Sequence, residues 1–412
     1  MIDLLRNSEY CFDTDVFHGE HFSAIFESTE ASPSKSVSAL KAMYRKCMDK
    51  DELNRIGARK LLETIRFDQG DLGLGDYTQD YYLDREKHGK KIAAYRQFLI
   101  SKVKLFHHDA SLPINERKIA IDVDEIIEHE TELAKILVPE EDRRNFTKMY
   151  NLRRFSDMLT LMPLVDWARY FHFVAPFALN NYLANNPEIL ITEIDYMRRV
   201  SELIKSTDPR IITNYAYLRY SSSWGGELGE RYEDISQEFL RAMFGREEKP
   251  PRWKDCTTET MHRMKYATGA LYVKKAFNEA SKNVTLEMIN DLQDAFLSMM
   301  TENDWMDEST KVTAIDKARH ILRQIGYPDF ILDDEKLDDY YKGLRVKEWD
   351  SYSQMVDKVA RWNNEFQFKR LMKPVDRNEF DFNPAIVNAY YSFMSNSISE
   401  QAQAIPTSFY NS

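Results

Sequence analysis

The chain has 412 residues, 43% of them hydrophobic and 13% aromatic, which is enough to bury a large core and excludes an intrinsically disordered protein. Its 67 acidic residues outnumber its 56 basic residues, and the resulting net charge of −11 argues against binding to nucleic acid or to anionic membranes. Only 13 glycines and 13 prolines occur, and long stretches are rich in Leu, Glu, Lys, Arg, Ala and Met. This composition favours a mainly α fold.

Apolar residues recur at intervals of three and four along most of the chain, which predicts amphipathic helices. In chain order the predicted helical segments are 36–66, two helices within 88–138 divided near Pro113, a helix from Ser156, 187–244 with a glycine break at 224–229, 285–300, and a helix after Asp307 that ends at Gly326. We expect Asp307 to cap the last of these helices. The pattern becomes β-like only after Asn383, where it predicts a strand at 386–391.

The apolar faces of the last two predicted helices can be named. In 285–300 the apolar residues of one face are Leu286, Ile289, Leu292, Phe296 and Met299. In the helix after Asp307 they are Val312, Ile315, Ile321, Leu322 and Ile325. Each set lies along one side of a helix, as expected for a side that packs against a core.

Several motifs occur in an order and at a spacing that resemble one known family. The terminal motif is Asn383-Pro384-Ala385-Ile386-Val387-Asn388-Ala389-Tyr390-Tyr391. Others are Lys41-Ala42-Met43-Tyr44 with Cys47, Leu72-Gly73-Leu74-Gly75, Trp253 with Cys256, Gly269-Ala270-Leu271-Tyr272-Val273, Trp305-Met306-Asp307, and Ile325-Gly326-Tyr327-Pro328. From about residue 38 to the end the chain resembles the neprilysin-like (M13) zinc metallopeptidases.

The resemblance implies a fold and a division of the chain. It implies a large helical domain of the M13 N-terminal type at 36–375, which in the family limits access to small peptides. Residues 376–412 would begin the thermolysin-like catalytic sheet, and 1–35 form a divergent N-terminal segment. Two departures stand out: the family has a block after Arg66 that is missing here, and residues 400–406 do not follow its pattern. We expect the strand at 386–391 to be an unpaired edge when this part is alone.

The H-E-x-x-H motif, with which the family holds zinc, does not occur in the 412 residues. We therefore expect no cofactor in this chain, with zinc only on a catalytic part that it lacks, and no peptidase activity by the chain alone. One interpretation is that the sequence is the non-catalytic part of a metalloendopeptidase that cleaves oligopeptides. The alternative is a catalytically inactive paralogue that binds peptides or pairs with a homologue, and a helical scaffold is a weaker third.

Asn388 and Ala389 are the candidate substrate-binding residues. An edge strand can pair with an extended peptide, and an Asn side chain offers both a donor and an acceptor. The resemblance implies that Asn388 holds the substrate backbone and that the Ala389 carbonyl accepts from it. The alternative to a substrate-binding role is an ordinary structural strand with a turn-forming Asn. Tyr390 and Tyr391 are more simply interpreted as packing residues, and only one of them can share a face with Asn388.

The chain contains only three cysteines. Cys47 and Cys256 match family positions that pair as a disulfide, which would form only in an oxidising compartment. Two buried thiols are the alternative for a cytosolic protein. Cys11 is left over and is expected to be a free thiol.

Other patterns are weaker. His18, His21 and Cys11 suggest metal ligands, but no fourth ligand is apparent, so metal binding is not favoured. The acidic run Asp333, Asp334, Glu335, Asp338 and Asp339 lacks the spacing of an EF-hand loop and is better interpreted as a solvated face. Asn145 and Asn283 begin N-x-S/T sequons, which support secretion weakly.

Partners and location follow from the resemblance more than from the residues. The resemblance implies peptide substrates and an extracellular or plasma-membrane ectodomain. The chain as given has no apolar signal core at its N-terminus and no apolar run long enough to span a bilayer. Taken literally, the N-terminus would indicate a cytosolic protein.

Overall fold

The computed structural model describes residues 34–47, 71–75, 77–139, 142–143, 151–191, 193–222, 228–372, 376, 378–380, 382–392 and 395–402. These residues divide into two compact units. Unit 1 holds 71–250 and 363–372, and unit 2 holds 34–47, 251–362 and 376–402. The division passes through helix α19 (Tyr352–Arg370).

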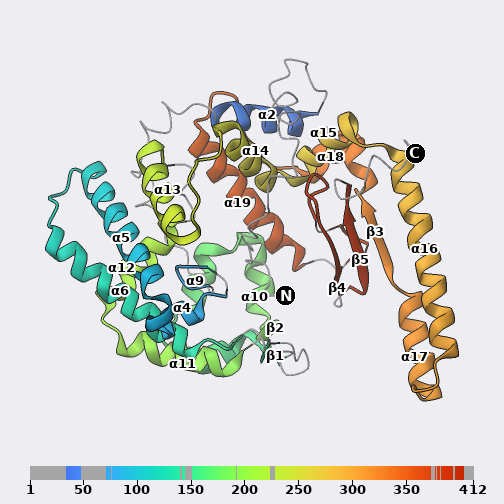
Figure 1. The fold of residues 1–412 in the computed structure, drawn as a ribbon, viewed down its shortest axis with the longest axis horizontal. Helices are drawn as coiled ribbons and strands as arrows, with labels where there is room; N and C mark the ends of the chain where they lie inside the picture. The colour runs from blue at the N-terminus through green and yellow to red at the C-terminus, as the bar shows by residue number, and fades with distance from the viewer. Residues whose placement is uncertain are drawn as a thin grey trace. The chain divides into compact units, whose positions relative to one another are not determined.

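Unit 1 is a helical body (Figure 1). Its helices are α4 (Gln79–Leu83), α5 (Arg85–Asp109), α6 (Glu116–Ile136), α8 (Met158–Leu161), α9 (Trp167–Val174), α10 (Asn180–Ala184), α11 (Ile194–Ser206), α12 (Pro209–Ser222) and α13 (Glu230–Phe244). Its 3-10 turns are η5 (Phe155–Asp157) and η6 (Phe177–Leu179). Strands β1 (Asn151–Arg154) and β2 (Glu188–Ile191) pair antiparallel, with Asn151 opposite Ile191.

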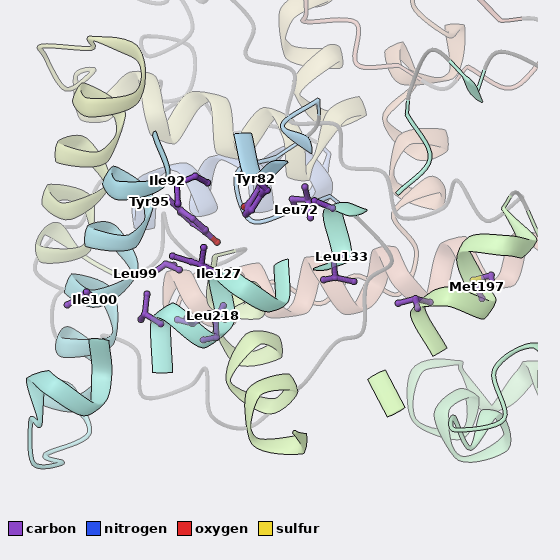
Figure 2. Close-up of a cluster of buried hydrophobic side chains, with 14 of the residues drawn as sticks. Leu72, Tyr82, Ile92, Tyr95, Leu99, Ile100, Ile127, Leu133, Met197 and Leu218 are labelled. Carbon is purple, nitrogen blue, oxygen red and sulfur yellow. The ribbon is translucent and has the colours of Figure 1, made fainter. Parts of the chain in front are cut away.

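Caps and apolar faces explain the longest helices of unit 1. The Asp84 side chain accepts from the Lys87 amide at the start of α5, and the Asn115 side chain accepts from the Lys118 amide at the start of α6. Gly245 ends α13 in the left-handed conformation, with φ of 70°. Helix α6 packs against α4, α5, α11 and α12. The core between them is built on residues such as Leu72, Tyr95, Leu99 and Ile127 (Figure 2).

Unit 2 combines helices with a small sheet. Its helices are α2 (Lys35–Cys47), α14 (Arg252–Arg263), α15 (Lys265–Ala276), α16 (Glu279–Glu302), α17 (Glu308–Arg319), α18 (Asp334–Tyr340) and the first part of α19, and η8 (Asp329–Leu332) is a 3-10 turn. Helices α16 and α17 pack together as a hairpin beside the sheet (Figure 1). Asp307 caps α17 by accepting from the Thr310 amide, as predicted from the sequence.

The sheet of unit 2 has the order β3-β5-β4, with β3 at Leu322–Gly326, β4 at Ala389–Ser392 and β5 at Ser397–Gln401. Strand β5 is central. It pairs parallel with β3, where Leu322 lies opposite Ser397, and antiparallel with β4, where Ala389 lies opposite Glu400. The sheet joins a segment from the middle of the chain to the last described residues.

The mainly α fold and most of the predicted helices are confirmed, and the two helices around Pro113 are α5 and α6. Three predictions are wrong. The helix after Asp307 does not continue to Gly326, because it ends at Arg319 and 322–326 is strand β3. The terminal strand lies at 389–392 rather than 386–391; it pairs with β5 along one edge, and no described strand pairs with its other edge. The segment 187–244, predicted as helical throughout, begins with strand β2 at 188–191, and its partner β1 was not predicted.

Some predictions fall outside the described residues. These are the helix beyond residue 47, the glycine break at 224–227, residues 403–406, and the residues Cys11, His18, His21 and Asn145. The boundaries predicted at residues 35 and 375 stay predictions. Within the described part of the chain, no helix has the length and apolar character needed to cross a bilayer.

Candidate peptide-binding strand

The candidate site is the outer edge of strand β4. One edge of β4 pairs with β5, and no described strand pairs with the other edge. The β4 side chains are exposed apart from Ser392, which is half-buried. An accessible, unpaired strand edge presents backbone N–H and C=O groups that can accept a further strand.

The register decides which backbone groups point outward. The Gln401 amide donates to the Asn388 carbonyl at 3.2 Å, so these two residues form a hydrogen-bonded pair. In an antiparallel ladder such pairs alternate with pairs that do not bond to each other. Ala389, opposite Glu400, belongs to the second kind, and so does Tyr391, opposite Ile398. The N–H and C=O groups of Ala389 and Tyr391 therefore point away from β5.

The Asn388 side chain lies against this edge. Its Oδ1 accepts from the Ala389 amide at 2.8 Å, so one outward N–H group is occupied by a neighbouring side chain. The Asn388 side chain is half-buried. The structure thus brings together the two residues that were predicted as substrate-binding, in one hydrogen-bonded arrangement.

The segment before β4 is anchored to the helices of unit 2. Asn383 Nδ2 donates to the Met261 carbonyl of α14 at 2.9 Å, and Asn383 Oδ1 accepts from the Ala385 amide at 3.0 Å. Pro384 lies so close to Gly269 of α15 that a Cβ there would come within 2.8 Å of the proline ring. These contacts fix the direction in which the chain enters β4.

Tyr390 and Tyr391 are not core residues. Their exposed fractions are 39% and 40%, so each side chain is partly covered, and the interpretation of both as packing residues stays a prediction. The Tyr391 hydroxyl donates to Asn396 Oδ1 at 2.8 Å, across the turn to β5. Tyr390 lies on the same face of the strand as Asn388, because alternate side chains share a face.

Glu400 is the residue that sequence reasoning missed. It lies opposite Ala389 on β5, on the face that Ala389 shares with Tyr391. Partial burial raises the pKa of its carboxyl group above the usual value. In β5, the buried residues Ser397, Ser399 and Gln401 alternate with half-buried residues. Because the buried side chains are polar, the sequence shows no alternation of apolar and polar residues that would have predicted this strand.

The other predicted sites have ordinary structural surroundings. In the acidic run, Asp333 caps α18, Asp334 pairs with Lys274, and Asp338 accepts from the hydroxyl groups of Ser34 and Ser36. Cys256 is fully buried on α14, which packs against α2, the helix that carries Cys47. Asn283 is exposed at the start of α16.

Across the described ranges of the chain, no three His, Cys, Asp or Glu side chains are grouped so that they could hold a metal ion. The residues in these ranges therefore do not fit a zinc ion.

Comparison with known proteins agrees with these features. The profile of peptidase family M13 matches residues 63–328. Neprilysin-1 of Caenorhabditis elegans is 42% identical over 99% of this chain and 61% of its own length. Endothelin-converting enzyme 1 of Rattus norvegicus is 30% identical over 84% of this chain and 44% of its own length. The chain belongs to peptidase family M13, and it spans less than two thirds of the length of these relatives.

Solved structures show the same fold. The Mycobacterium tuberculosis zinc metalloprotease Zmp1 in complex with an inhibitor superposes with a TM-score of 0.79, covering 95% of this chain and 63% of that protein, at 22% identity. PepO of Lactobacillus rhamnosis gives a TM-score of 0.78 over 94% of this chain and 65% of that protein, at 15% identity.

Proposed function

We propose that this chain holds an extended oligopeptide for a zinc metalloendopeptidase and that the 412 residues do not cleave peptides on their own. The observation that carries the proposal is the register of β4, in which the backbone groups of Ala389 point away from β5 at the exposed outer edge of the strand. A peptide in β conformation would add to this edge as a further strand. Backbone pairing supplies affinity that does not depend on the peptide's sequence.

Asn388 would set the register of that peptide. Its Oδ1 now accepts from the Ala389 amide, and its amide nitrogen carries two further donors. A bound peptide carbonyl would accept from the Ala389 amide in place of Oδ1, while the Asn388 amide reaches the next peptide unit. The Ala389 carbonyl would accept from the peptide N–H.

Cleavage needs what the H-E-x-x-H helix supplies in this family. When bound there, zinc activates a water molecule for attack on the peptide carbonyl. The motif does not occur in these 412 residues. This is the ground for expecting peptide binding without hydrolysis, both for a part of an active peptidase and for an inactive paralogue.

An apolar surface on α16 supports the view that unit 2 works with further polypeptide. Met288, Leu292, Phe296 and Met299 follow one side of α16, and each exposes between 51% and 69% of its surface. The opposite side of α16 packs against α17 and β3. A helix with apolar residues on both sides is typical of a protein interior.

The proposed setting is extracellular, with Cys47 and Cys256 joined as a disulfide. Complete burial of Cys256 and the packing of α14 against α2 support this pairing. In the chain-entropy description a bridge across so long a loop stabilises by roughly 4–5 kcal/mol. We expect alkylation of the secreted protein, unfolded in denaturant without reduction, to label one cysteine, Cys11, and Cys11→Ser to leave the melting temperature unchanged. Labelling of all three would contradict the pairing.

Binding without cleavage is directly testable. The purified chain is mixed with a fluorescent oligopeptide in zinc-containing buffer, and binding is followed by anisotropy. We expect saturable binding and recovery of intact peptide by mass spectrometry. Asn388→Ala should weaken binding about 5- to 10-fold, the share of one hydrogen bond, whereas the exposed Asn378→Ala should not. Chelator-sensitive cleavage products would contradict the proposal, and so would equal binding by both variants.

A further inference from the structure

The register of the unit 2 sheet places Glu400 in a row of side chains that runs toward the outer edge of β4. Figure 1 shows β5 between β3 and β4. Glu400 of β5 lies opposite Ile325 of β3 and opposite Ala389 of β4. Because opposite residues of neighbouring strands point to the same face of a sheet, these three side chains form one row. Ile398 and Tyr391 belong to the next row on that face.

The two neighbours of Glu400 in its row differ in size and accessibility. Ile325 is a bulky side chain that exposes only 1% of its surface. Ala389 is exposed and has only a methyl group. The half-buried Glu400 side chain is therefore bordered by a large residue toward β3 and by a small one toward the outer edge of β4.

The Glu400 carboxyl group has no counterion within the described part of the chain. None of the described residues donates a hydrogen bond to it or forms an ion pair with it, and burial raises its pKa without an opposing effect. Arg323 of β3 shares this face, but its guanidinium group donates to Asn290 Oδ1 of α16. A half-buried carboxylate without a partner would gain from a cation placed beside it.

A peptide strand on the outer edge of β4 would add a fourth member to the row. Its residue opposite Ala389 would pair with the N–H and C=O groups that point away from β5, so its side chain would lie on the face of Glu400. Opposite Cα atoms are about 4.5 Å apart in a non-bonded pair and about 5.5 Å apart in a bonded pair, which places this residue about 10 Å from Glu400. The Ala389 methyl group leaves space above it in which the Glu400 side chain and a long cationic side chain can meet.

Tyr391 offers the same cation a second contact. Its side chain lies on the face of Glu400 and diagonal to it, a separation that aromatic and long side chains can bridge. The Tyr391 hydroxyl donates to Asn396 Oδ1 at 2.8 Å, which restricts the position of the ring. A lysine or arginine side chain above this ring would be attracted to its face.

We propose that Glu400 gives the β4 edge a preference for oligopeptides with a lysine or arginine at the position opposite Ala389. This inference rests on the proposed function, because it names the class of peptide that the same edge would bind. A neutral side chain at that position would leave the carboxylate unpaired. An acidic side chain would place a second carboxylate in the row, which is unfavourable.

Three fluorescent hexapeptides that differ only at one central residue, lysine, methionine or glutamate, test this preference by anisotropy with the full chain at pH 7.5. Methionine is long and unbranched like lysine but carries no charge. We expect the lysine peptide to bind at least 5-fold more tightly than the methionine peptide, and the glutamate peptide to bind most weakly. Glu400→Gln keeps the size of the side chain and should remove the difference between lysine and methionine. Glu400→Lys should bind the glutamate peptide most tightly.

Two further variants separate this preference from other effects. The net charge of −11 would attract a cationic peptide to any part of the chain. Glu335→Gln removes one negative charge from an exposed residue of α18, so it should keep the wild-type preference if Glu400 is the cause. Asn388→Ala should weaken binding of all three peptides by the same factor and leave their ratio unchanged.

The outcomes distinguish this inference from the proposed function. Equal affinity of the wild-type chain for the three peptides, with binding still dependent on Asn388, would exclude the preference and leave the proposed function in place. A lysine preference that persists in Glu400→Gln would also exclude it. Absence of saturable binding of any peptide would overturn the proposed function and this inference together. The first comparison uses the wild-type chain, so it does not depend on the folding of a variant.

Discussion

Single glycines in unit 1 have opposite structural roles. Gly73 lies in a turn where the Tyr95 hydroxyl and the Glu130 carboxyl group fill the space that a side chain would need. Gly89 lies inside α5, and no atom stands within 4 Å of a Cβ built there. The first glycine is required by packing, whereas the second only weakens a helix.

These surroundings predict opposite effects of the same substitution. Gly73→Ala should destabilise unit 1 by about 2–4 kcal/mol, because the turn must move away from a buried carboxylate and leave it with fewer donors. Gly89→Ala should stabilise it by about 0.5–1 kcal/mol through the higher helix propensity of alanine. Urea unfolding of the two variants measures both changes. A loss of stability in both, or in neither, would contradict this interpretation of the turn.

At the scale of elements, helix α16 has two apolar sides, of which the described residues cover one. The sequence pattern grouped Leu286, Ile289 and Leu292 on a single face. The structure separates them: Leu286 and Ile289 are half-buried against the rest of unit 2, whereas Leu292 exposes 63% of its surface. An apolar period identifies a helix but does not say which neighbour covers it.

The two sides of α16 should respond differently to a charge. Leu292→Glu on the exposed side should change the free energy of unfolding by no more than about 0.5 kcal/mol and should reduce binding of a hydrophobic dye. Ile289→Glu on the covered side should cost about 1–3 kcal/mol, because a carboxylate would enter an apolar contact. If Leu292→Glu unfolds the protein, its side chain is not exposed as described.

The sheet of unit 2 shows which elements the sequence could not predict. Helices such as α5, α6 and α16 depend on local period and caps, and these were predicted. Ile321, just before strand β3, and Leu322 and Ile325 within it have a spacing that also fits a helix, and 322–326 becomes a strand because β5 pairs with it. Strand β5 buries Ser399, whose hydroxyl donates to Gln324 Oε1 at 3.0 Å, so its core side is polar.

At the candidate site, too, local motifs could be predicted from the sequence and tertiary contacts could not. Asn388 and Ala389 could be named from the resemblance of their motif. The outward direction of the Ala389 groups could not, because it depends on the Asn388–Gln401 pairing in space. The closeness of Glu130 to Gly73 is also a tertiary contact, between residues 57 positions apart, and no local pattern indicates it.

At the scale of the whole molecule, the chain is an M13 family member that spans 61% of the length of Neprilysin-1 of Caenorhabditis elegans. Its described residues include an exposed outer edge of β4 and do not fit a zinc ion. The proposed function therefore depends on whether a peptide binds at the outer edge of β4.

The most direct test is a pair of proline substitutions with peptide affinity and unfolding measured on each. Ala389→Pro removes an N–H group that faces away from β5 and donates to Asn388 Oδ1, so it should lower the free energy of unfolding by no more than about 1 kcal/mol and weaken peptide binding at least 10-fold. Tyr390→Pro removes an N–H group that faces β5 and should lower stability. Wild-type peptide affinity in a folded Ala389→Pro chain would contradict the account.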